Sequence, residues 1–552
     1  MLKSSESAKG ALVGPLFFLA LALAAVGSRL GAVTPWALSA LALLGAGWAG
    51  YADGKTSSRL PIIVVLFAAL VLFNVQVVSP AYTPAGLYQP LLLLTAFFVA
   101  RRLTQRAERD AAVAAFLLCA ALAAWGLYEV GLGGLVRAQA LFETPATFSA
   151  VVNLTLVPLL AAMLVGVRYR MALAGIVLLS AAIFAADSRG GLLAMAGGLG
   201  FAAILGVRAR LLRARGIVIV LAMLAAGWVL AIALRALPAP RTEAGLSATD
   251  RAASSLSRLE LFALSWSAWK ERPIVGTGYL TFRYTLEQGR AQVPSYGTSS
   301  ETWFVHNDYL QTLQELGPLG LLAFLGLTLF PPLLTYRRLP DLAVEQRPVV
   351  VAVAAALAAM SVHAMVDFPF YVPICLLLYG ALLGALDQRL RTTASELTLE
   401  WRNSPLLRVA RAGVLTLVVL VLLRPVAAEA AAEWGLRKAA AGKGQVAALW
   451  LGVAQRIEPG DWRYHWYAGR FWEAQAVETG NREAAALAAN AFAAGFDANP
   501  LEVRNLLGKI SVHRRHRRLL RDPADPSALQ QWLAQAKALA PLSPEVQWEL
   551  AR

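Results

Sequence analysis

The sequence predicts an all-α protein that crosses a membrane about thirteen times and ends in a helical domain outside that membrane. Three observations lead to this fold class. Of the 552 residues, 58% are hydrophobic and only 15% are charged, whereas soluble proteins carry roughly 25% charged residues. Apolar runs recur from Gly10 to about Pro425, and the mean hydropathy is +0.57. Short basic clusters separate these runs, as expected of a protein inserted in a bilayer.

The apolar runs have the length that a membrane span requires, which is about 20 residues. They lie near 11–28, 35–52, 61–78, 84–100, 111–130, 148–167, 171–187, 190–207, 216–234, 317–336, 348–366, 369–386 and 407–424. We interpret each run as one transmembrane helix, which gives thirteen spans.

The charged connections between these spans predict the orientation of the chain. The net charge is +16, but it comes from short clusters between apolar runs, so we expect no nucleic acid partner. With thirteen spans, the basic segments all fall on the same side as the N-terminus. They are 101–109, 168–170, 208–215, 337–347 and 387–411. The positive-inside rule therefore predicts a cytoplasmic N-terminus and a C-terminus on the outer side of the membrane.

One connection on the outer side is much longer than the others, spanning 235–316. Unstructured loops of this length are uncommon and usually functional. Apolar residues recur along part of it at helical spacing, which predicts an amphipathic helix at the bilayer surface. These residues are Leu256, Leu259, Phe262, Trp266 and Trp269. The segment Gly276-Thr277-Gly278 then predicts a turn.

The composition changes after residue 425, so we divide the chain into a transmembrane domain at 1–425 and a second domain at 426–552. The second domain is rich in Ala, charged residues and aromatic residues, and contains no spanning run. Helical stretches end at 458–460, 498–500 and 540–541, a period of roughly 41 residues, with small residues at packing positions. These are Ala468, Gly469, Ala491 and Gly495. The pattern predicts stacked helix pairs of tetratricopeptide type.

His306 and Arg189 are the first candidates for chemistry. His306 ends the long loop, and Asn307 and Asp308 follow it. An imidazole there can orient or deprotonate a hydroxyl near neutral pH; a helix-capping or interfacial histidine is the alternative. Arg189 lies between two apolar runs with almost no loop to place it in water. Such a cation is a functional candidate, and snorkelling to the interface is the alternative.

Further residues on the outer side could extend this site. Arg258, on the predicted amphipathic helix, could join Arg189 in binding a diphosphate, because guanidinium groups bind phosphate oxygens bidentately; a solvated helix face is the alternative. His363 and Asp367 are four residues apart, so they share a helix face and could orient each other or serve a structural role. The basic run 513–521 is either a solvated face or a contact for anionic headgroups or phosphorylated glycans.

Several function classes have no supporting motif. The sequence contains no Walker loop, no zinc-ligand spacing, no Gly-x-Ser-x-Gly and no haem motif, so ATP-driven transport and hydrolase chemistry are not indicated. The two cysteines, Cys119 and Cys375, lie inside apolar runs, so we expect neither a disulfide framework nor a metal site. We expect no cofactor.

With these residues in view, the chain resembles the O-antigen ligase and polymerase superfamily of bacterial envelope glycosyltransferases. The most specific match is His306-Asn307, a nine-residue gap and then Gly317-Pro318-Leu319-Gly320, at the end of the long loop. Three shorter segments are also similar to family elements. They are Ser188-Arg189-Gly190, Arg258 ahead of Pro273-Ile274-Val275-Gly276-Thr277-Gly278, and His363-x-x-x-Asp367-Phe368-Pro369. The resemblance covers about 180–370.

The resemblance implies a GT-C-like membrane fold and a metal-independent transfer of a glycan from undecaprenyl diphosphate to an acceptor hydroxyl in the periplasm. Arg189 and Arg258 would hold the departing diphosphate, and His306 would activate or position the acceptor hydroxyl. The resemblance further implies a substrate site formed by neighbouring family positions. These are Asn307, Gly317, Gly320, His363 and Asp367.

The acceptor divides the family, and three alternatives stay open. It is another lipid-linked repeat in polymerases, a lipid A–core sugar in ligases, or a protein such as pilin. The C-terminal domain departs from the minimal ligase layout, and repeat arrays provide extended binding surfaces. It could hold a growing chain, a protein acceptor or a chain-length regulator through 426–552. We favour a polysaccharide polymerase slightly over a lipid A–core ligase.

Two readings from other classes compete with glycan transfer. A transporter or flippase for an envelope glycolipid would place polar groups near mid-membrane and contain duplicated halves. Asn74, Gln76 and Asn153 are the few such polar residues, and the halves show no repeat. A scaffold that recruits partners through its helical repeats is the third reading. A scaffold function would not explain why Arg189, Arg258 and His306 all lie on one side of the membrane.

Overall fold

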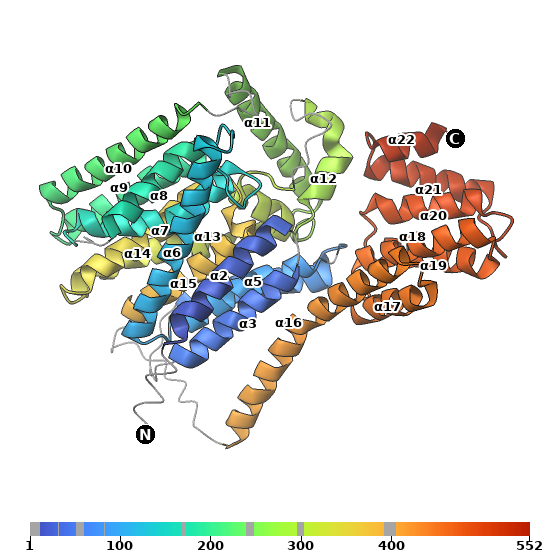
Figure 1. The fold of residues 1–552 in the computed structure, drawn as a ribbon, viewed down its shortest axis with the longest axis horizontal. Helices are drawn as coiled ribbons and strands as arrows, with labels where there is room; N and C mark the ends of the chain where they lie inside the picture. The colour runs from blue at the N-terminus through green and yellow to red at the C-terminus, as the bar shows by residue number, and fades with distance from the viewer. Residues whose placement is uncertain are drawn as a thin grey trace.

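The protein is helical throughout the part of the chain that the structure describes (Figure 1). The computed structural model describes residues 11–30, 33–50, 60–81, 83–167, 172–238, 248–294, 303–390 and 405–551, and it contains no strand over these residues. Of the described helices, eight are long and apolar enough to cross a membrane by length and composition. The chain is therefore an all-α polytopic membrane protein, as predicted.

Each of the thirteen predicted spans coincides with a helix. They are α2 (Val13–Leu30), α3 (Val33–Gly50), α4 (Leu60–Phe73) with the π-turn η1 (Asn74–Val78), α5 (Pro84–Ala100), α6 (Gln105–Gly131), α7 (Pro145–Leu164), α8 (Leu173–Ala186), α9 (Arg189–Arg208), α10 (Ala214–Arg235), α13 (Asp308–Arg338), α14 (Arg347–His363), α15 (Pro373–Leu390) and α16 (Pro405–Ala440). Four of them, α2, α5, α8 and α14, are shorter apolar helices. Thirteen crossings therefore stays a prediction.

Helices α7 and α14 form the centre of the bundle. Every residue of α14 from Val350 to Ser361 is buried, whereas α10 buries only four residues and presents the rest of its apolar surface outward. Small side chains allow close packing in the centre. A Cβ on Gly198 of α9 would lie 2.7 Å from the Ala355 carbonyl oxygen, so the two backbones touch there. Close approach of this kind stabilises helix pairs in membranes, and it fixes the start of α9 beside the end of α14.

One end of the bundle carries paired cations. Arg101 and Asp387, both nearly buried, form an ion pair of 3.0 Å between α5 and α15. Arg389 pairs with Glu108 at 2.7 Å. Arg101 and Arg389 both belong to predicted basic segments. The predicted basic segment 168–170 and residues 391–404 lie outside the described residues. The opposite end of the bundle carries the long loop.

The long loop contains α11 (Ala248–Glu271), α12 (Phe282–Gly289) and the 3-10 turn η3 (Arg290–Gln292), which lie beyond one end of the bundle (Figure 1). The predicted helix exists, but only part of its predicted apolar stripe is buried: Phe262 is half-buried against the hydrophobic cluster of the loop. Leu259 and Trp266 are 62% and 46% exposed, whereas Leu261 and Leu264 pack against α12. The side chain of Leu256 lies outside the described part. The exposed side chains of Leu259 and Trp266 can contact a bilayer surface. That contact stays a prediction.

The C-terminal helices pack one against the next, beside the bundle (Figure 1). They are α17 (Gly444–Ile457), α18 (Trp462–Thr479), α19 (Arg482–Ala498), α20 (Val503–Arg515), α21 (Pro526–Leu539) and α22 (Pro544–Ala551). Their ends match the predicted breaks, and the small residues serve packing: a Cβ on Gly469 would lie 2.6 Å from the Phe492 ring. Within the predicted basic run, Arg514 pairs with Glu549 at 3.0 Å.

The predicted domain boundary at 425/426 falls inside a continuous helix. Helix α16 runs through Pro425 into the C-terminal helices, and Arg424 pairs with Glu458 at 3.0 Å. The Tyr88 hydroxyl donates to the Leu422 carbonyl at 2.6 Å, which ties α16 to α5. The boundary and the tetratricopeptide assignment both stay predictions.

A candidate active site at the loop end of the bundle

His306 lies beside Asp367, which in turn lies beside His363 at the end of α14. Its Nδ1 is 3.0 Å from Asp367 Oδ1, and His363 Nε2 is 3.7 Å from Asp367 Oδ2, too long for a hydrogen bond. The Asp308 amide donates to the Ala364 carbonyl at 2.8 Å and so holds the two segments together. The contact brings together residues 61 positions apart, and the carboxylate lies between two imidazoles.

Asp367 is not on the helix that the sequence predicted for it. Helix α14 ends at His363, and Asp367 follows one turn later with its amide bonded to the His363 carbonyl at 3.0 Å. Burial raises the pKa of the Asp367 carboxyl, but the neighbouring imidazoles of His306 and His363 lower it more, so this pKa lies well below its ordinary value. The carboxylate is therefore ionised at neutral pH.

Aromatic rings hold the His306 imidazole in place. The Phe368 ring meets it edge to face, with 5.0 Å between centroids, and stacks on Phe304 at 4.2 Å. His306 itself has φ +60°, a left-handed conformation that is uncommon for residues other than glycine. Its side chain is 16% exposed, whereas that of Asp367 is 3% exposed. The imidazole is thus the member of the pair that a substrate can reach, and strained backbone of this kind clusters at functional sites.

Arg189 is the first residue of α9, and packing fixes that helix start next to His363. The Ser188 hydroxyl caps the helix by accepting from the Gly191 amide at 3.2 Å, and Asn153 donates to the Gly191 carbonyl at 2.8 Å. A Cβ on Gly190 would lie 3.1 Å from a Val366 methyl group and 3.5 Å from His363 Nε2, so the first turn of α9 packs directly on the segment that follows α14. Arg189 is exposed. The structure therefore places the Ser-Arg-Gly element against the histidine–carboxylate group.

Two further arginines lie at the same helix junction and were missed from the sequence. Arg137 donates to the carbonyls of Ala186 and Asp187, at 3.0 Å each. Arg235 donates to the carbonyls of Phe184 and Ala185, at 3.1 and 3.0 Å. Cations are favoured at a helix C-terminus, where the last carbonyls lack helical partners. Their position just outside apolar runs, like that of Arg189, was the signal that could have indicated them.

Arg258 lies on α11, at the edge of the face by which that helix packs on the rest of the loop. Arg258 is half-buried, and its neighbour Ser257 is buried. One turn further, Leu261 belongs to the same hydrophobic cluster as Val305, the residue before His306. The structure thus brings the helix that carries Arg258 to the segment that carries His306.

The other predicted substrate-site residues have clear structural contacts. Asn307 caps α13, accepting from the Leu310 amide at 3.0 Å. Gly317 interrupts α13 with φ +70°, and a Cβ there would lie 2.2 Å from the Ile274 carbonyl oxygen. Gly320 is buried one turn later. Gly317 therefore lets the turn before α12 lie directly on α13, and a contact with substrate stays a prediction for Asn307, Gly317 and Gly320.

Glu315 is the centre of a buried network that the sequence analysis missed. Its carboxyl oxygens accept from the backbone amides of Leu280 and Phe282 at 3.0 and 3.2 Å. They also accept from Gln311 Nε2 at 3.1 Å and from the Tyr371 hydroxyl at 2.8 Å. Glu315 is fully buried. An acidic residue at the start of a predicted span was the signal, because such groups are rare in apolar runs.

The fold and site together define a class of protein: a helical membrane protein with a histidine–carboxylate pair at the loop end of its bundle, beside a helix start that bears an arginine. Residues 174–325 match the family model described as O-antigen ligase. This match confirms, over that segment, the resemblance to the O-antigen ligase and polymerase superfamily of membrane glycosyltransferases. It includes Arg189, Arg258 and His306, whereas His363 and Asp367 lie beyond it. A search of curated proteins found no match.

Proposed function

We propose that this protein transfers a glycan from undecaprenyl diphosphate to an acceptor hydroxyl at the periplasmic face of a bacterial inner membrane. The observation that carries the proposal is the pairing of His306 with Asp367, at 3.0 Å, beside the helix start that bears Arg189. A base, a group that orients it and an exposed guanidinium group are what this reaction needs from a protein. The O-antigen ligase match, which includes Arg189 and His306, supports the same chemistry.

His306 acts as the base in this proposal. When its Nδ1 carries the proton and donates to Asp367, its Nε2 is left with a lone pair for the acceptor hydroxyl. The acceptor oxygen attacks the anomeric carbon of the donor sugar, its proton passes to Nε2, and the bond between that carbon and the diphosphate oxygen breaks. The ionised Asp367 stabilises the imidazolium that results.

Arg189 and Arg258 stabilise the diphosphate as it leaves with the electron pair of the broken bond. Guanidinium groups bind phosphate oxygens bidentately and stay protonated. No proton donor is needed for this leaving group, and the reaction is metal-independent because the arginines neutralise the developing charge.

The acceptor is a second lipid-linked glycan, which makes the protein a polysaccharide polymerase rather than a lipid A–core ligase. The C-terminal helices support this choice, because they extend the outer face beyond a minimal ligase, and a chain-length regulator could bind them through 426–552. A protein acceptor such as pilin is the alternative. Transport is not favoured, since Asn74 and Asn153, which could have lined a pathway, donate to backbone carbonyls of the loop region and of α9.

Reconstituted protein tests the proposal. Wild type is given a lipid-linked oligosaccharide, either alone or with lipid A–core, and products are separated by size. We expect a ladder of lengths without added acceptor, and loss of that ladder in His306→Ala and Arg189→Ala. Arg189→Lys should retain only part of the activity, because lysine keeps the charge and lacks the bidentate fork.

Arg215→Ala is the matched control, since Arg215 is exposed at the opposite end of the bundle. It should polymerise like the wild type. Modified lipid A–core without a ladder would make the protein a ligase. Turnover that survives both His306→Ala and Arg189→Ala would remove the proposed site.

A further inference from the structure

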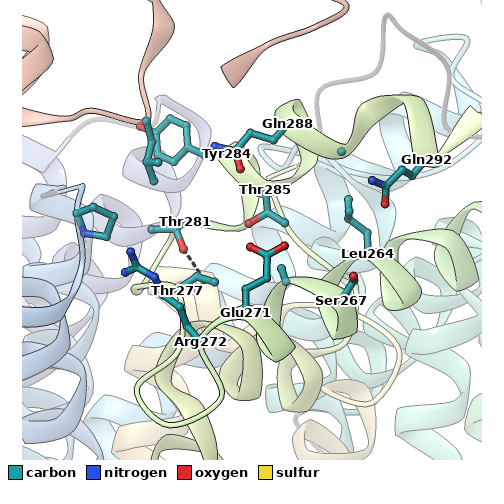
Figure 2. Close-up of a pocket in the computed structure, with 14 residues that line it drawn as sticks. Leu264, Ser267, Glu271, Arg272, Thr277, Thr281, Tyr284, Thr285, Gln288 and Gln292 are labelled. Atoms are coloured by element: carbon teal, nitrogen blue, oxygen red, sulfur yellow. Dashed lines mark hydrogen bonds between the residues drawn. The ribbon is translucent and has the colours of Figure 1, made fainter. Parts of the chain in front are cut away.

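A polar pocket lies at the contact between the long loop and the C-terminal helices (Figure 2). Its volume is about 280 Å³, which equals the space of roughly nine waters at ~30 Å³ each and suits one or two sugar rings. The end of α11, the turn after it and α12 form most of the wall, and Leu501 closes it from the C-terminal side. No residue proposed for the transfer step lines this pocket.

The pocket wall is rich in hydroxyl and amide groups. Figure 2 shows Glu271 and Thr285 facing each other across the pocket, with Gln288 and Gln292 at its rim. Over the described residues, the side chains of Glu271, Gln288 and Gln292 form no hydrogen bond with the protein. Groups that both donate and accept match the vicinal hydroxyls of a sugar.

Hydrogen bonds inside the wall preorganise the hydroxyl groups. Gln314 Nε2 donates to Thr285 Oγ1 at 3.0 Å, which leaves the Thr285 hydroxyl hydrogen for a ligand. Thr277 and Thr281 bond each other at 2.8 Å. On the far wall, Asn499 donates to the Tyr284 hydroxyl at 2.7 Å and holds the C-terminal helices against α12. A rigid wall of this kind lowers the entropy lost on binding.

The pocket also lies within reach of the transfer site. Gln314, which touches the pocket wall, is six residues along α13 from Asp308, the neighbour of Asn307 and the start of that helix. Six residues of helix span about 9 Å. A glycan whose reacting sugar meets His306 can therefore place a sugar further along its chain in the pocket.

We propose that this pocket binds a sugar residue of the glycan a short distance from the transfer site, with Leu501, from the turn between α19 and α20, on one side. The inference rests on the proposed function for the identity of the glycan. The sugar belongs either to the donor or to the acceptor, and both present the same hydroxyl chemistry. Glu271 accepts from sugar hydroxyls, and Gln288 and Gln292 donate and accept at the rim.

The test uses the full-length protein in nanodiscs and a free oligosaccharide released from lipid-linked repeat units. Binding is measured by calorimetry for wild type, for Gln288→Ala combined with Gln292→Ala, and for Gln445→Ala. The last is the matched control, because Gln445 is an exposed glutamine on α17 away from the pocket. We expect the double variant to bind roughly ten-fold more weakly, given the worth of one or two hydrogen bonds, and Gln445→Ala to bind like wild type.

Kinetic measurements separate the two sources of the sugar. The assay uses the lipid-linked oligosaccharide as donor and the free oligosaccharide as acceptor, so that each is varied separately. In the double variant, a raised KM for the lipid-linked donor with kcat unchanged assigns the pocket to the donor glycan, and a raised KM for the free acceptor assigns it to the acceptor. Equal binding by wild type and the double variant, or equal loss in Gln445→Ala, overturns the proposal.

These experiments also distinguish a failure of the pocket proposal from a failure of the proposed transferase function. If wild type binds the oligosaccharide through the glutamines but transfers nothing, the pocket stands and the transferase proposal fails. If wild type transfers glycan and the double variant keeps its binding and both KM values, only the pocket proposal fails. His306→Ala should keep wild-type binding of the free oligosaccharide while losing transfer.

Discussion

Among the buried carboxyl groups at the loop end of the bundle, Glu315 and Asp367 have different surroundings. Glu315 accepts four hydrogen bonds from groups that stay in place: two backbone amides, an amide side chain and a hydroxyl. Asp367 instead faces two imidazoles, one of them 16% exposed. Satisfied buried networks specify a structure, whereas a carboxylate that orients an accessible imidazole serves acid–base chemistry. Burial alone therefore does not separate a structural carboxyl group from a functional one; the partners do.

The largest effect should come from Asp367→Asn. The amide keeps the shape of the side chain but cannot accept from Nδ1–H in the same way, so His306 loses the group that sets its tautomer. We expect the transfer rate to fall by roughly 10²–10⁴-fold, measured as ladder formation, with thermal unfolding in detergent nearly unchanged. A large loss of stability with full activity per folded molecule would reverse the assigned roles.

Glu315→Ala should act on stability instead. It leaves the buried amides of Leu280 and Phe282 without an acceptor, and we expect the free energy of unfolding to fall by about 3 kcal/mol. Thermal unfolding of the purified protein measures this. Glu345→Ala is the control, because Glu345 is exposed in the connection before α14, and it should change stability by less than about 0.5 kcal/mol. Comparable stability of the two variants would contradict the structural role.

Gly317→Ala should have a smaller effect on the same network. The new Cβ would press on the Ile274 carbonyl, and φ is +70°, so we expect a loss of about 2 kcal/mol. Gly326 lies on the same helix with its nearest neighbour atom at 3.4 Å. Gly326→Ala should therefore leave thermal unfolding nearly unchanged. A Gly317→Ala protein as stable as Gly326→Ala would show that the turn does not need this close approach.

Tyr371→Phe should have the smallest effect, about 1 kcal/mol, because it removes one of the four donors to Glu315. Tyr379→Phe is the matched control, since the Tyr379 hydroxyl donates to the Leu327 carbonyl at 2.9 Å. In a Glu315→Gln background, Tyr371→Phe should lower the free energy of unfolding by less than it does in wild type. Tyr379→Phe should lower it by the same amount in both backgrounds. Full additivity of both would show that Tyr371 is not part of the Glu315 network.

The spans and the site motif could be predicted from the sequence because both depend on local pattern. An apolar run of about 20 residues is a property of one segment, and His306 with Gly317 and Gly320 follows a fixed spacing. The partner of His306 depends instead on where α13 starts relative to the end of α14. That packing joins residues 61 positions apart, so no local pattern contains it.

The packing face of α11 could not be predicted for a related reason. Its most apolar stripe, with Leu259 and Trp266, is exposed, while the less apolar face around Ser265 packs inward. The Ser265 hydroxyl donates to Gln314 Oε1 at 2.7 Å, so a polar contact adds to the packing of Leu261 and Leu264 on that face. Hydrophobic periodicity ranks faces by apolar area and does not include such a bond.

The orientation of the C-terminal helices depends on the number of residues in α16, because α16 is one continuous helix. A flexible linker would not impose this dependence. Helix α16 has 36 residues, about 54 Å at 1.5 Å per residue, and the Tyr284–Asn499 contact provides a second attachment. One residue inserted into α16 would turn everything after it by about 100° and separate Asn499 from Tyr284. The rotational register of α16, and not only its length, therefore determines whether Asn499 meets Tyr284.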